Sequence, residues 1–234
     1  MSGASDVGSE TGGRSATPAR GGGAVSHSSD YFSNHANAER FPFSVYHAPI
    51  ASFMRRELER LEGARDVVNL GCGFFPGLRT MPPRHRYVGA DIDARVVEAM
   101  SKAPVPHGFD VRFVHVDGAT LPFADASVDL VFATEVIEHV DPADGWLAEI
   151  RRVLRSGGRI ALSTPNYGSW QLPLVESTFL EAVARLQGFS RKGIHPNRYG
   201  KERLARELAA AGFADARVTT TPLQFALCVA ATRP

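Results

Sequence analysis

The chain has 234 residues, 44% of them hydrophobic and 22% charged, which is an ordinary composition for one globular domain with appendages. Its formal net charge of +1 gives no strong electrostatic field, so neither a nucleic-acid backbone nor an anionic membrane surface is an expected partner. The two cysteines, Cys72 and Cys228, lack the spacing of a disulfide framework or a zinc site, which favours a reduced, cytoplasmic protein.

The N-terminal part shows no targeting pattern. It lacks the basic-then-apolar pattern of a signal peptide, and no apolar run is long enough to span a bilayer. Residues 1–29 are rich in Gly, Ser, Ala and Thr and nearly free of large apolar side chains, so we expect a disordered tail. A single domain is then expected over residues 30–234.

Residues 30–62 form the first segment for which the sequence predicts structure. Aromatic residues recur among polar ones as far as Pro49, and two interpretations are open. The segment either packs its aromatic side chains on the core, which we favour, or forms a lid that supplies Tyr46 and His47 to a ligand site. From Ile50 to Leu61 the apolar residues have helical spacing, so we expect a helix there.

A glycine-rich turn after a buried strand is the most informative local feature. Residues 66–70 are an apolar, β-branched run that ends at Gly71 and Gly73, a pattern typical of a parallel strand that breaks into a tight turn. Without a Cβ, these glycines admit positive φ and let a ligand approach the backbone. Ligands of open α/β sheets bind beyond the carboxyl ends of the strands, so we expect the floor of a nucleotide-type site here.

Strands and helices then alternate along the chain. The apolar runs predict further strands over 87–91, 111–116, 127–133 and 159–163, and helices over 94–100, 142–154 and 199–211, with a turn at 156–158 before the fifth strand. This alternation predicts an α/β fold with a mostly parallel sheet and helices on both faces.

The C-terminal part departs from this alternation. Residues 168–197 are expected to be an insertion with a short helix near 179–186. The last two strands, 216–220 and 224–230, are joined by Thr221-Pro222, a link too short for a parallel crossover. The sheet should therefore end in a hairpin and carry one antiparallel strand.

Polar residues stand at the ends of the predicted strands, where a ligand would bind. Asp91 follows Gly71 by 20 residues, about the spacing at which a carboxylate receives ribose hydroxyl groups in dinucleotide folds. A carboxylate suits this task because it can accept both hydroxyls of a vicinal diol. After the third strand, Asp117 can accept from an adenine amino group, while the amide of Gly118 or Ala119 donates to a ring nitrogen.

The fourth strand ends at the crevice where a second substrate would meet the first ligand, in the run Thr134-Glu135-Val136-Ile137-Glu138-His139. Glu138 and His139 are candidates for deprotonating an acceptor hydroxyl, because the histidine pKa lies near working pH; alternatively, His139 packs beneath the ligand. His195 follows the predicted insertion. It is either a base or acceptor contact, or a loop histidine that caps the next helix.

Residues 67–166 resemble class I S-adenosylmethionine-dependent methyltransferases of the small-molecule group that includes ubiquinone-biosynthesis enzymes (methyltransferase type 11). The matching pieces are Val68-Asn69-Leu70-Gly71-Cys72-Gly73, Val88-Gly89-Ala90-Asp91, Asp117-Gly118-Ala119, Val128-Asp129-Leu130-Val131, Glu135-Val136-Ile137-Glu138-His139-Val140 and Val153-Leu154-Arg155-Ser156-Gly157-Gly158-Arg159. The resemblance implies a Rossmann-like sheet of seven strands in the order 3-2-1-4-5-7-6, with strand 7 antiparallel. It also implies S-adenosyl-L-methionine as cofactor, bound by Asn69, Gly71, Cys72, Gly73, Asp91, Ile92, Asp117, Gly118, Ala119, Thr134 and Glu135.

Two positions depart from the family pattern. Asn69 stands where the family usually has an acidic residue, so it keeps a hydrogen-bond acceptor but no charge near the methionine ammonium. Phe75 stands where the third glycine normally lies, so either the turn is wider or the phenylalanine faces the ligand. Together with Phe74, Tyr167 and Trp170, Phe75 either lines an apolar acceptor pocket or packs in the core.

The expected activity is transfer of a methyl group to an oxygen, nitrogen or carbon atom of a small organic acceptor. The aromatic content of residues 30–49 and of the 168–197 insertion indicates an apolar or aromatic acceptor. No nucleic-acid partner or membrane insertion is expected. No metal is expected either, because no clustered histidine and carboxylate spacing occurs. No pattern indicates an oligomeric state.

Three alternatives stay open. A nicotinamide oxidoreductase would have glycine at the sixth position of its fingerprint, which is Pro76 when counted from Gly71. An adenine-modifying nucleic-acid methyltransferase would carry a Pro-Pro-aromatic loop where Thr134-Glu135-Val136 stands. A non-catalytic, methyltransferase-like binding protein is consistent with Asn69 and Phe75, and cofactor binding by the purified protein would distinguish it.

Overall fold

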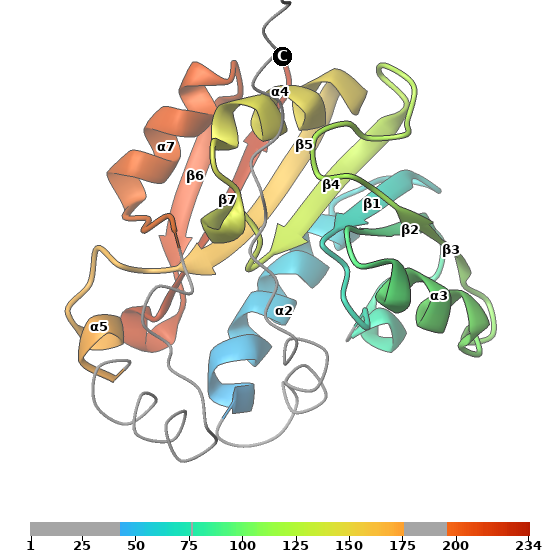
Figure 1. Ribbon diagram of the computed structural model, residues 1–234, viewed down its shortest axis with the longest axis horizontal. Coiled ribbons are helices and arrows are strands. Elements are labelled where there is room, and N and C mark those ends of the chain that lie inside the picture. Colours follow the sequence, from blue (N-terminus) through green and yellow to red (C-terminus); the bar gives the residue numbers. More distant parts are fainter. Residues whose placement is uncertain (1–42, 76, 176–195) are drawn as a thin grey trace, which may run out of the picture.

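The computed structural model describes residues 43–75, 77–175 and 196–234. The expected disordered tail, the first part of the 30–62 segment and most of the 168–197 insertion lie outside these residues. Within them, seven strands form one sheet in the order β3-β2-β1-β4-β5-β7-β6 (Figure 1). The strands are β1 (Asp66–Leu70), β2 (Arg86–Asp91), β3 (Asp110–His115), β4 (Val128–Thr134), β5 (Leu154–Pro165), β6 (Ala214–Thr220) and β7 (Ala226–Thr232).

The strand directions follow the expectation from the sequence. β1 to β5 are mutually parallel, whereas β7 runs antiparallel to both β5 and β6. Only a short 3-10 turn, η5 (Pro222–Gln224), links β6 to β7, and so short a link cannot make a parallel crossover. The predicted sheet order and the antiparallel seventh strand are therefore confirmed.

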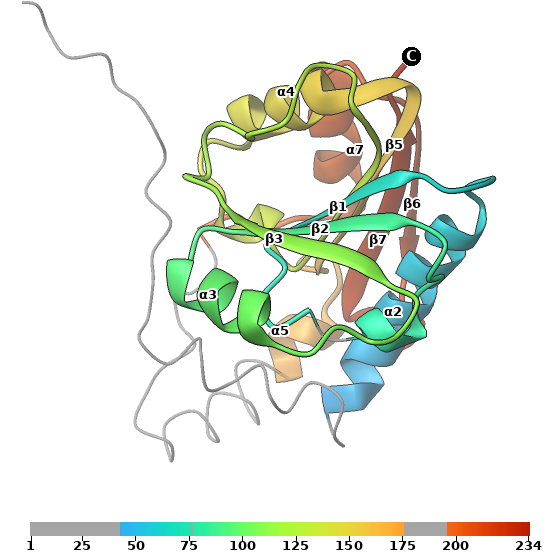
Figure 2. The same cartoon turned by 90° about the vertical axis from the view of Figure 1, so that its right-hand side faces the viewer.

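Helices cover both faces of the sheet. They are α2 (Phe43–Glu59), α3 (Ala94–Lys102), α4 (Ala143–Val153), α5 (Gln171–Val175) and α7 (Lys201–Ala210). α4 and α7 pack on one face, and α2 and α3 pack on the other, as the turned view shows (Figure 2). None of the described helices is long and apolar enough to cross a membrane.

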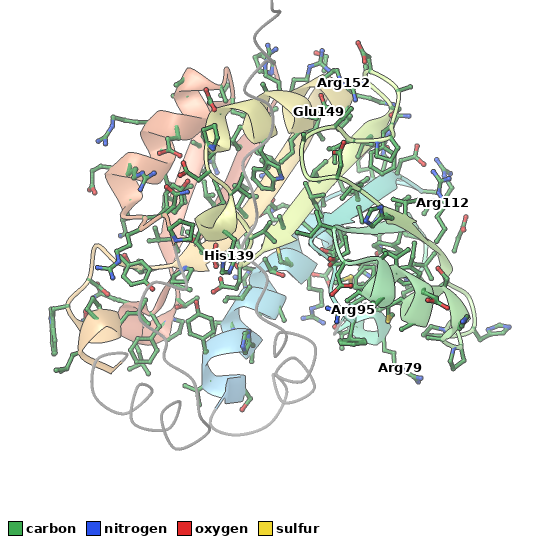
Figure 3. All side chains as sticks on the ribbon, viewed as in Figure 1. Arg79, Arg95, Arg112, His139, Glu149 and Arg152 are labelled. Atoms are coloured by element: carbon green, nitrogen blue, oxygen red, sulfur yellow. The ribbon has the colours of Figure 1, made fainter. Side chains whose placement is uncertain are left out.

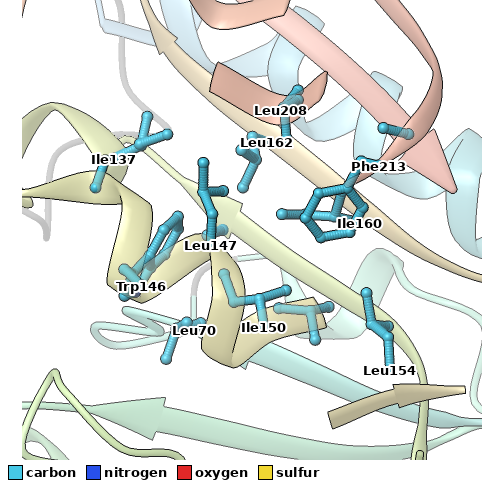
Figure 4. Packing of buried hydrophobic residues seen from close by; sticks show 14 of the residues in the cluster. Leu70, Ile137, Trp146, Leu147, Ile150, Leu154, Ile160, Leu162, Leu208 and Phe213 are labelled. Atoms are coloured by element: carbon cyan, nitrogen blue, oxygen red, sulfur yellow. The ribbon is translucent and has the colours of Figure 1, made fainter. Parts of the chain in front are cut away.

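Each central strand contributes to two apolar clusters, because successive side chains of a strand point to opposite faces. Val68 of β1 belongs to the cluster beneath α4 and α7, whereas its neighbour Val67 belongs to the cluster beneath α2. Figure 4 shows the first cluster, in which Trp146, Leu147 and Ile150 of α4 pack towards the sheet. Burial on both faces explains why β1 and β4 are nearly continuous apolar runs in the sequence.

The helix predicted over 50–61 is longer at its start, since α2 spans Phe43–Glu59 and includes Pro49. Proline inside a helix removes one backbone hydrogen bond, which disfavours the longer helix. Burial outweighs that cost here, because Ile50, Met54 and Leu58 form an apolar stripe with at most 3% of each side chain exposed.

The turn predicted at 156–158 is instead an irregularity within β5. Strand β5 begins at Leu154, directly after α4, and its pairing with β4 shifts register between Leu154 and Arg159. Gly157 adopts a φ of +77°, which glycine takes without strain, so the strand accommodates the extra residues as a bulge. The prediction of a separate turn was wrong because a bulge and a turn both favour glycine.

Candidate functional site

The predicted cofactor residues gather at one edge of the sheet. β1 to β4 are parallel, so their carboxyl ends lie along the same edge. The residues predicted to bind the cofactor end or follow these four strands: Asn69, Gly71, Cys72 and Gly73 at β1, Asp91 and Ile92 at β2, Asp117, Gly118 and Ala119 at β3, and Thr134 and Glu135 at β4.

Asp91 ties the glycine turn after β1 to the end of β2. The Gly71 N–H donates to the Ala90 carbonyl oxygen at 2.7 Å. The Gly73 N–H donates to Oδ2 of Asp91 at 2.8 Å, and the Asp93 N–H donates to Oδ1 at 2.9 Å. The Asp91 side chain is buried, with 6% exposed. Each carboxylate oxygen has a second lone pair, so Asp91 can hold the turn and still accept from a ligand.

The two glycines of the turn differ in what lies beside them. Gly71 has a φ of +70°, and a Cβ there would lie 2.5 Å from Cγ2 of Val136, so this glycine lets the segment after β4 pack against the turn. Gly73 has a φ of +50°, and a Cβ there would meet no atom within 4 Å. The turn is therefore closed by protein at Gly71, whereas Gly73 is buried but has space where its Cβ would stand, so a ligand can approach the backbone there.

Asn69 carries an unsatisfied acceptor. The side chain is buried with 5% exposed, and its Oδ1 makes no hydrogen bond with any described residue. A buried acceptor without a partner costs about 1–3 kcal/mol. An ammonium group is the kind of donor that would satisfy it, so the amide can bind the methionine end of the expected cofactor without a charge of its own.

Cys72 contributes through its backbone. Its side chain is 3% exposed, and Sγ lies 3.5 Å from the Gly73 carbonyl oxygen. Burial raises the pKa of the thiol, and the negative charge of Asp91 raises it further, so the thiol stays neutral. The cysteine is therefore a packing residue whose main chain forms the turn.

Asp117 organises the loop after β3. Its Oδ1 accepts from the Ala119 N–H at 2.9 Å and from the Thr120 N–H at 2.8 Å, an Asx turn. The bonds from Thr120 and Ala119 lower the pKa of the Asp117 carboxyl, so it is ionised. The Ala119 amide is thus engaged, which favours Gly118 as the donor to a ligand ring. A Cβ on Gly118 would lie 3.5 Å from Cγ2 of Ile92, so the ends of β2 and β3 meet here.

An ion pair on α4 supports this loop from outside the site (Figure 3). Nη2 of Arg152 lies 2.7 Å from Oε1 of Glu149, which also accepts from the Leu121 N–H at 2.8 Å. Arg152 in turn donates to the carbonyl oxygens of Leu121 at 3.1 Å and Phe123 at 3.0 Å. The side-chain bond from Arg152 lowers the pKa of Glu149, so both members of the pair stay charged while they position the loop.

Two carboxylates follow β4 and are surrounded by hydroxyl groups. Oε1 of Glu135 accepts from the Ser163 hydroxyl at 2.8 Å, and Oε2 accepts from the hydroxyl of Tyr46 on α2. Oε2 of the fully buried Glu138 accepts from the Thr164 hydroxyl at 3.0 Å. Ser163 and Thr164 were not among the residues predicted for the site. A signal was present, because polar residues at the carboxyl end of an apolar strand also marked the other site segments.

Tyr46 satisfies both interpretations of the N-terminal segment. It packs against the small cluster of Ile50, Ala226 and Cys228, as a core residue would. Its hydroxyl also reaches Glu135, as a residue of the site would. The ring of His47 meets that of Tyr46 edge-on, with 5.0 Å between ring centroids.

The structure describes one of the two candidate catalytic histidines, His139. His139 is half-buried at the end of the 3-10 turn η3 (Ile137–His139) and lies at the carboxyl-end edge of β4 (Figure 3). Its place fits either of the two roles considered for it. His195 lies outside the described residues, so its role stays a prediction.

Phe75 faces the core and not the ligand. Its ring is 3% exposed and lies 6.2–6.3 Å, centroid to centroid, from the rings of Tyr87, Phe113 and Phe132. It keeps the left-handed backbone, with a φ of +46°, that a glycine would adopt at this place. Phenylalanine at this position therefore lacks the conformational freedom of glycine, but its ring packs in the core beneath the turn.

We expect Phe75→Ala to lower the free energy of unfolding by about 3–5 kcal/mol, because the cavity would be lined by aromatic rings. Phe75→Gly removes the same side chain but relieves the positive φ, which is worth roughly 1 kcal/mol. In urea unfolding, the glycine variant should therefore be at least as stable as the alanine variant. A glycine variant that is clearly less stable than the alanine variant would contradict the assigned backbone strain.

The other aromatic candidates do not form one pocket wall. Trp170 is 72% exposed. The ring of Tyr167 lies beneath the guanidinium of Arg198, at 5.2 Å from its centroid. Phe74 is half-buried in the glycine turn.

A family model described as a methyltransferase domain matches residues 68–162, which include all four strand ends of the predicted cofactor site. Residues 68–162 therefore match a methyltransferase domain. The sheet order and strand directions are those of the class I methyltransferase fold.

Curated relatives of the methyltransferase domain carry consistent names. A protein of Mycolicibacterium smegmatis named "Probable S-adenosylmethionine-dependent methyltransferase" is 41% identical over 103 residues, which is 44% of this chain and 38% of the relative. A malonyl-[acyl-carrier protein] O-methyltransferase of Hahella chejuensis is 30% identical over 140 residues, 58% of this chain and 45% of the relative. The match thus spans less than half the length of these relatives.

Solved structures agree on the fold. An S-adenosylmethionine-dependent methyltransferase from Mesorhizobium loti superposes with a TM-score of 0.59 at 18% identity, over 80% of this chain and 97% of the other. At this identity the likeness concerns the fold of the methyltransferase domain.

Proposed function

We propose that the protein transfers a methyl group from S-adenosylmethionine to an oxygen, nitrogen or carbon atom of a small organic acceptor. The observation that carries this proposal is the arrangement around Asp91. Its buried carboxylate holds the glycine turn at Gly73 and keeps acceptor capacity beside the open face of that turn. This is the chemistry that a ribose diol needs from a protein.

The described residues fit the chemical groups of the cofactor. Asp91 suits the ribose hydroxyls, and Asp117 with the Gly118 amide suits the adenine edge. The unpartnered Oδ1 of Asn69 suits the methionine ammonium. The open face of Gly73 provides close approach to the backbone. When bound, S-adenosylmethionine supplies a methyl group that its sulfonium makes electrophilic.

The protein's own task is then to align the acceptor atom with the methyl group and to exclude water. Alignment of this kind can lower a reaction barrier by roughly 7–11 kcal/mol. The segment after β4 is the proposed place for the acceptor, because it borders the glycine turn through Val136 and carries Glu135, Glu138 and His139. An apolar or aromatic acceptor remains the proposal from the aromatic content of the chain.

Titration calorimetry of the purified protein with S-adenosylmethionine and, separately, with NAD tests this proposal. We expect micromolar binding of the first and no binding of the second. Binding of NAD alone would favour an oxidoreductase. Binding of neither by a protein that melts cooperatively would favour a non-catalytic methyltransferase-like protein, with Asn69 and Phe75 as the first positions to change.

A further inference from the structure

Glu135 and Glu138, here called the carboxylate pair, form a cluster that cofactor binding and alignment do not explain. Glu138 is fully buried, with 0% exposed, and its Oε1 makes no hydrogen bond with any described residue. No lysine, arginine or histidine of the described residues forms an ion pair with Glu138. A buried, unpaired carboxylate is costly in its charged form, so the cluster is built to hold a proton or to face a positive charge.

The electrostatics agree with this geometry. Burial raises the pKa of the Glu138 carboxyl well above its usual range, and the negative charge of Glu135 raises it further. The hydroxyl of Thr164 opposes this effect only in part, through its hydrogen bond. Two carboxylates that cannot both be ionised without cost titrate as one unit.

Other groups that titrate face the pair from every neighbouring element. Burial raises the pKa of Cys228 on β7 to about 12, and the negative charge of Glu135 also raises it. Tyr199, before α7, feels the charge of Glu138. Among the described residues, Tyr46 on α2 and Ser163 on β5 donate to Glu135, His47 meets the Tyr46 ring edge-on, and His139 follows Glu138 on η3. Only the two histidines among them normally titrate near neutral pH, so they need controls.

The pair also lies next to the proposed cofactor site. Val136, between the two glutamates, packs against Gly71 so closely that a Cβ there would lie 2.5 Å from it. A sulfonium bound on the glycine turn would therefore bring its positive charge to the segment that carries the pair.

We propose that the carboxylate pair holds one proton in the free site, releases it when the positively charged methyl donor binds, and takes up the proton that the acceptor loses on methylation. This inference rests on the proposed function.

The charges and atoms balance. In the transfer, the methyl–sulfur bond breaks with its electrons left on sulfur, and a bond forms from the acceptor atom to the methyl carbon. The acceptor's X–H bond breaks with its electrons kept by X, and the proton passes to the pair. The sulfonium charge disappears as the pair gains one proton, so the net charge of the site is unchanged. The acceptor must therefore carry an O–H, N–H or C–H bond that it can lose.

Calorimetry in buffers of different ionisation enthalpy tests the proposal without knowledge of the acceptor. S-adenosylmethionine and its demethylated, uncharged product S-adenosylhomocysteine are titrated into the same protein at several pH values around neutral. We expect the sulfonium ligand to release up to one proton more than the thioether. Its affinity should also rise by up to about tenfold per pH unit over that range, whereas the thioether's affinity should not.

Matched variants locate the proton. Glu138→Gln removes the buried member of the pair, so the difference in proton release between the two ligands should vanish. Glu135→Gln leaves Glu138 buried and removes only the neighbouring charge, so it should reduce the difference without abolishing it. Glu98→Gln on α3 is the control, because Glu98 is an exposed carboxylate paired with Lys102 and should leave the difference unchanged. His139→Gln and His47→Gln should also retain it. If the difference vanishes in a histidine variant but persists in Glu138→Gln, the inference is overturned.

Other outcomes separate the two proposals. No binding of either ligand by a folded protein would overturn the proposed function, and this inference with it. Tight binding of both ligands with equal proton release would overturn this inference alone. Binding of MgCl₂ in the absence of ligand that is lost in both glutamine variants would make the pair a cation site, which also overturns it.

Unfolding in urea gives a readout that needs no ligand. A raised pKa in the folded protein means that Glu138 contributes stability that is fully present below the unfolded pKa of glutamate. That stability is lost as the pH rises through the folded pKa. The free energy of unfolding of the natural protein should therefore fall with rising pH relative to that of Glu138→Gln. Parallel pH curves for the two proteins would overturn the assignment of the proton to Glu138.

Discussion

Replacing Asp91 with Asn is expected to weaken S-adenosylmethionine binding by about 10- to 100-fold, the cost of losing hydrogen bonds to a charged acceptor. The amide keeps the size of the side chain but turns one acceptor oxygen into a donor. The Gly73 and Asp93 N–H groups already use both oxygens, at 2.8 and 2.9 Å, so the amide cannot serve them and a diol together. Titration calorimetry measures the loss.

Asp91→Ala would give a less specific result. It leaves two backbone N–H groups without their acceptor, so it should destabilise the glycine turn as well as remove the ligand contact.

Asp129→Asn is the matched control for Asp91→Asn. Asp129 is a partly buried carboxylate near the start of β4, at the opposite edge of the sheet. It accepts from the Asp66 N–H at 2.9 Å and pairs with Arg155 at 2.7 Å. We expect it to lower the melting temperature without changing cofactor affinity. Equal affinity losses in both variants would show that Asp91 acts through stability alone and would remove the ribose assignment.

Gly73→Ala is expected to reduce S-adenosylmethionine affinity by about tenfold or more, which corresponds to roughly 1.4 kcal/mol or more. Gly73 has open space where a Cβ would stand, and the proposed cofactor needs that space. The positive φ of +50° should add a stability cost of roughly 1–2 kcal/mol. Calorimetry and urea unfolding measure the two effects separately.

Gly63→Ala measures the stability cost of alanine at a positive φ where no ligand is expected to bind. Gly63 has a φ of +66° and, like Gly73, no atom within 4 Å of a built Cβ, but it lies in the turn between α2 and β1. Both variants should lose similar stability, and only Gly73→Ala should lose affinity. Unchanged affinity in Gly73→Ala would mean that the ligand does not approach the turn at this glycine.

The sequence by itself determined the architecture of the methyltransferase domain. Apolar β-branched runs that end in glycine or aspartate located β1 to β3, and the run that ends at Thr134-Glu135 located β4. The period of the apolar residues and the spacing of the residues that end each run are local properties of the chain, so they can be read from the sequence alone. The short Thr221-Pro222 link fixed the antiparallel strand, because chain length alone forbids a crossover. The same logic placed Asp91 and Asp117 at one edge, since parallel strands present their carboxyl ends together.

The tertiary structure alone decided what each side chain faces. The sequence left open whether Phe75 faces the ligand or packs in the core, and the structure shows that its ring packs in the core beneath the turn. Tyr46 and Ser163 lie far from Glu135 in the sequence, and only folding brings their hydroxyls to its two oxygens. Burial and charge coupling at Glu138 depend on neighbours from several elements, and no local pattern encodes such long-range contacts.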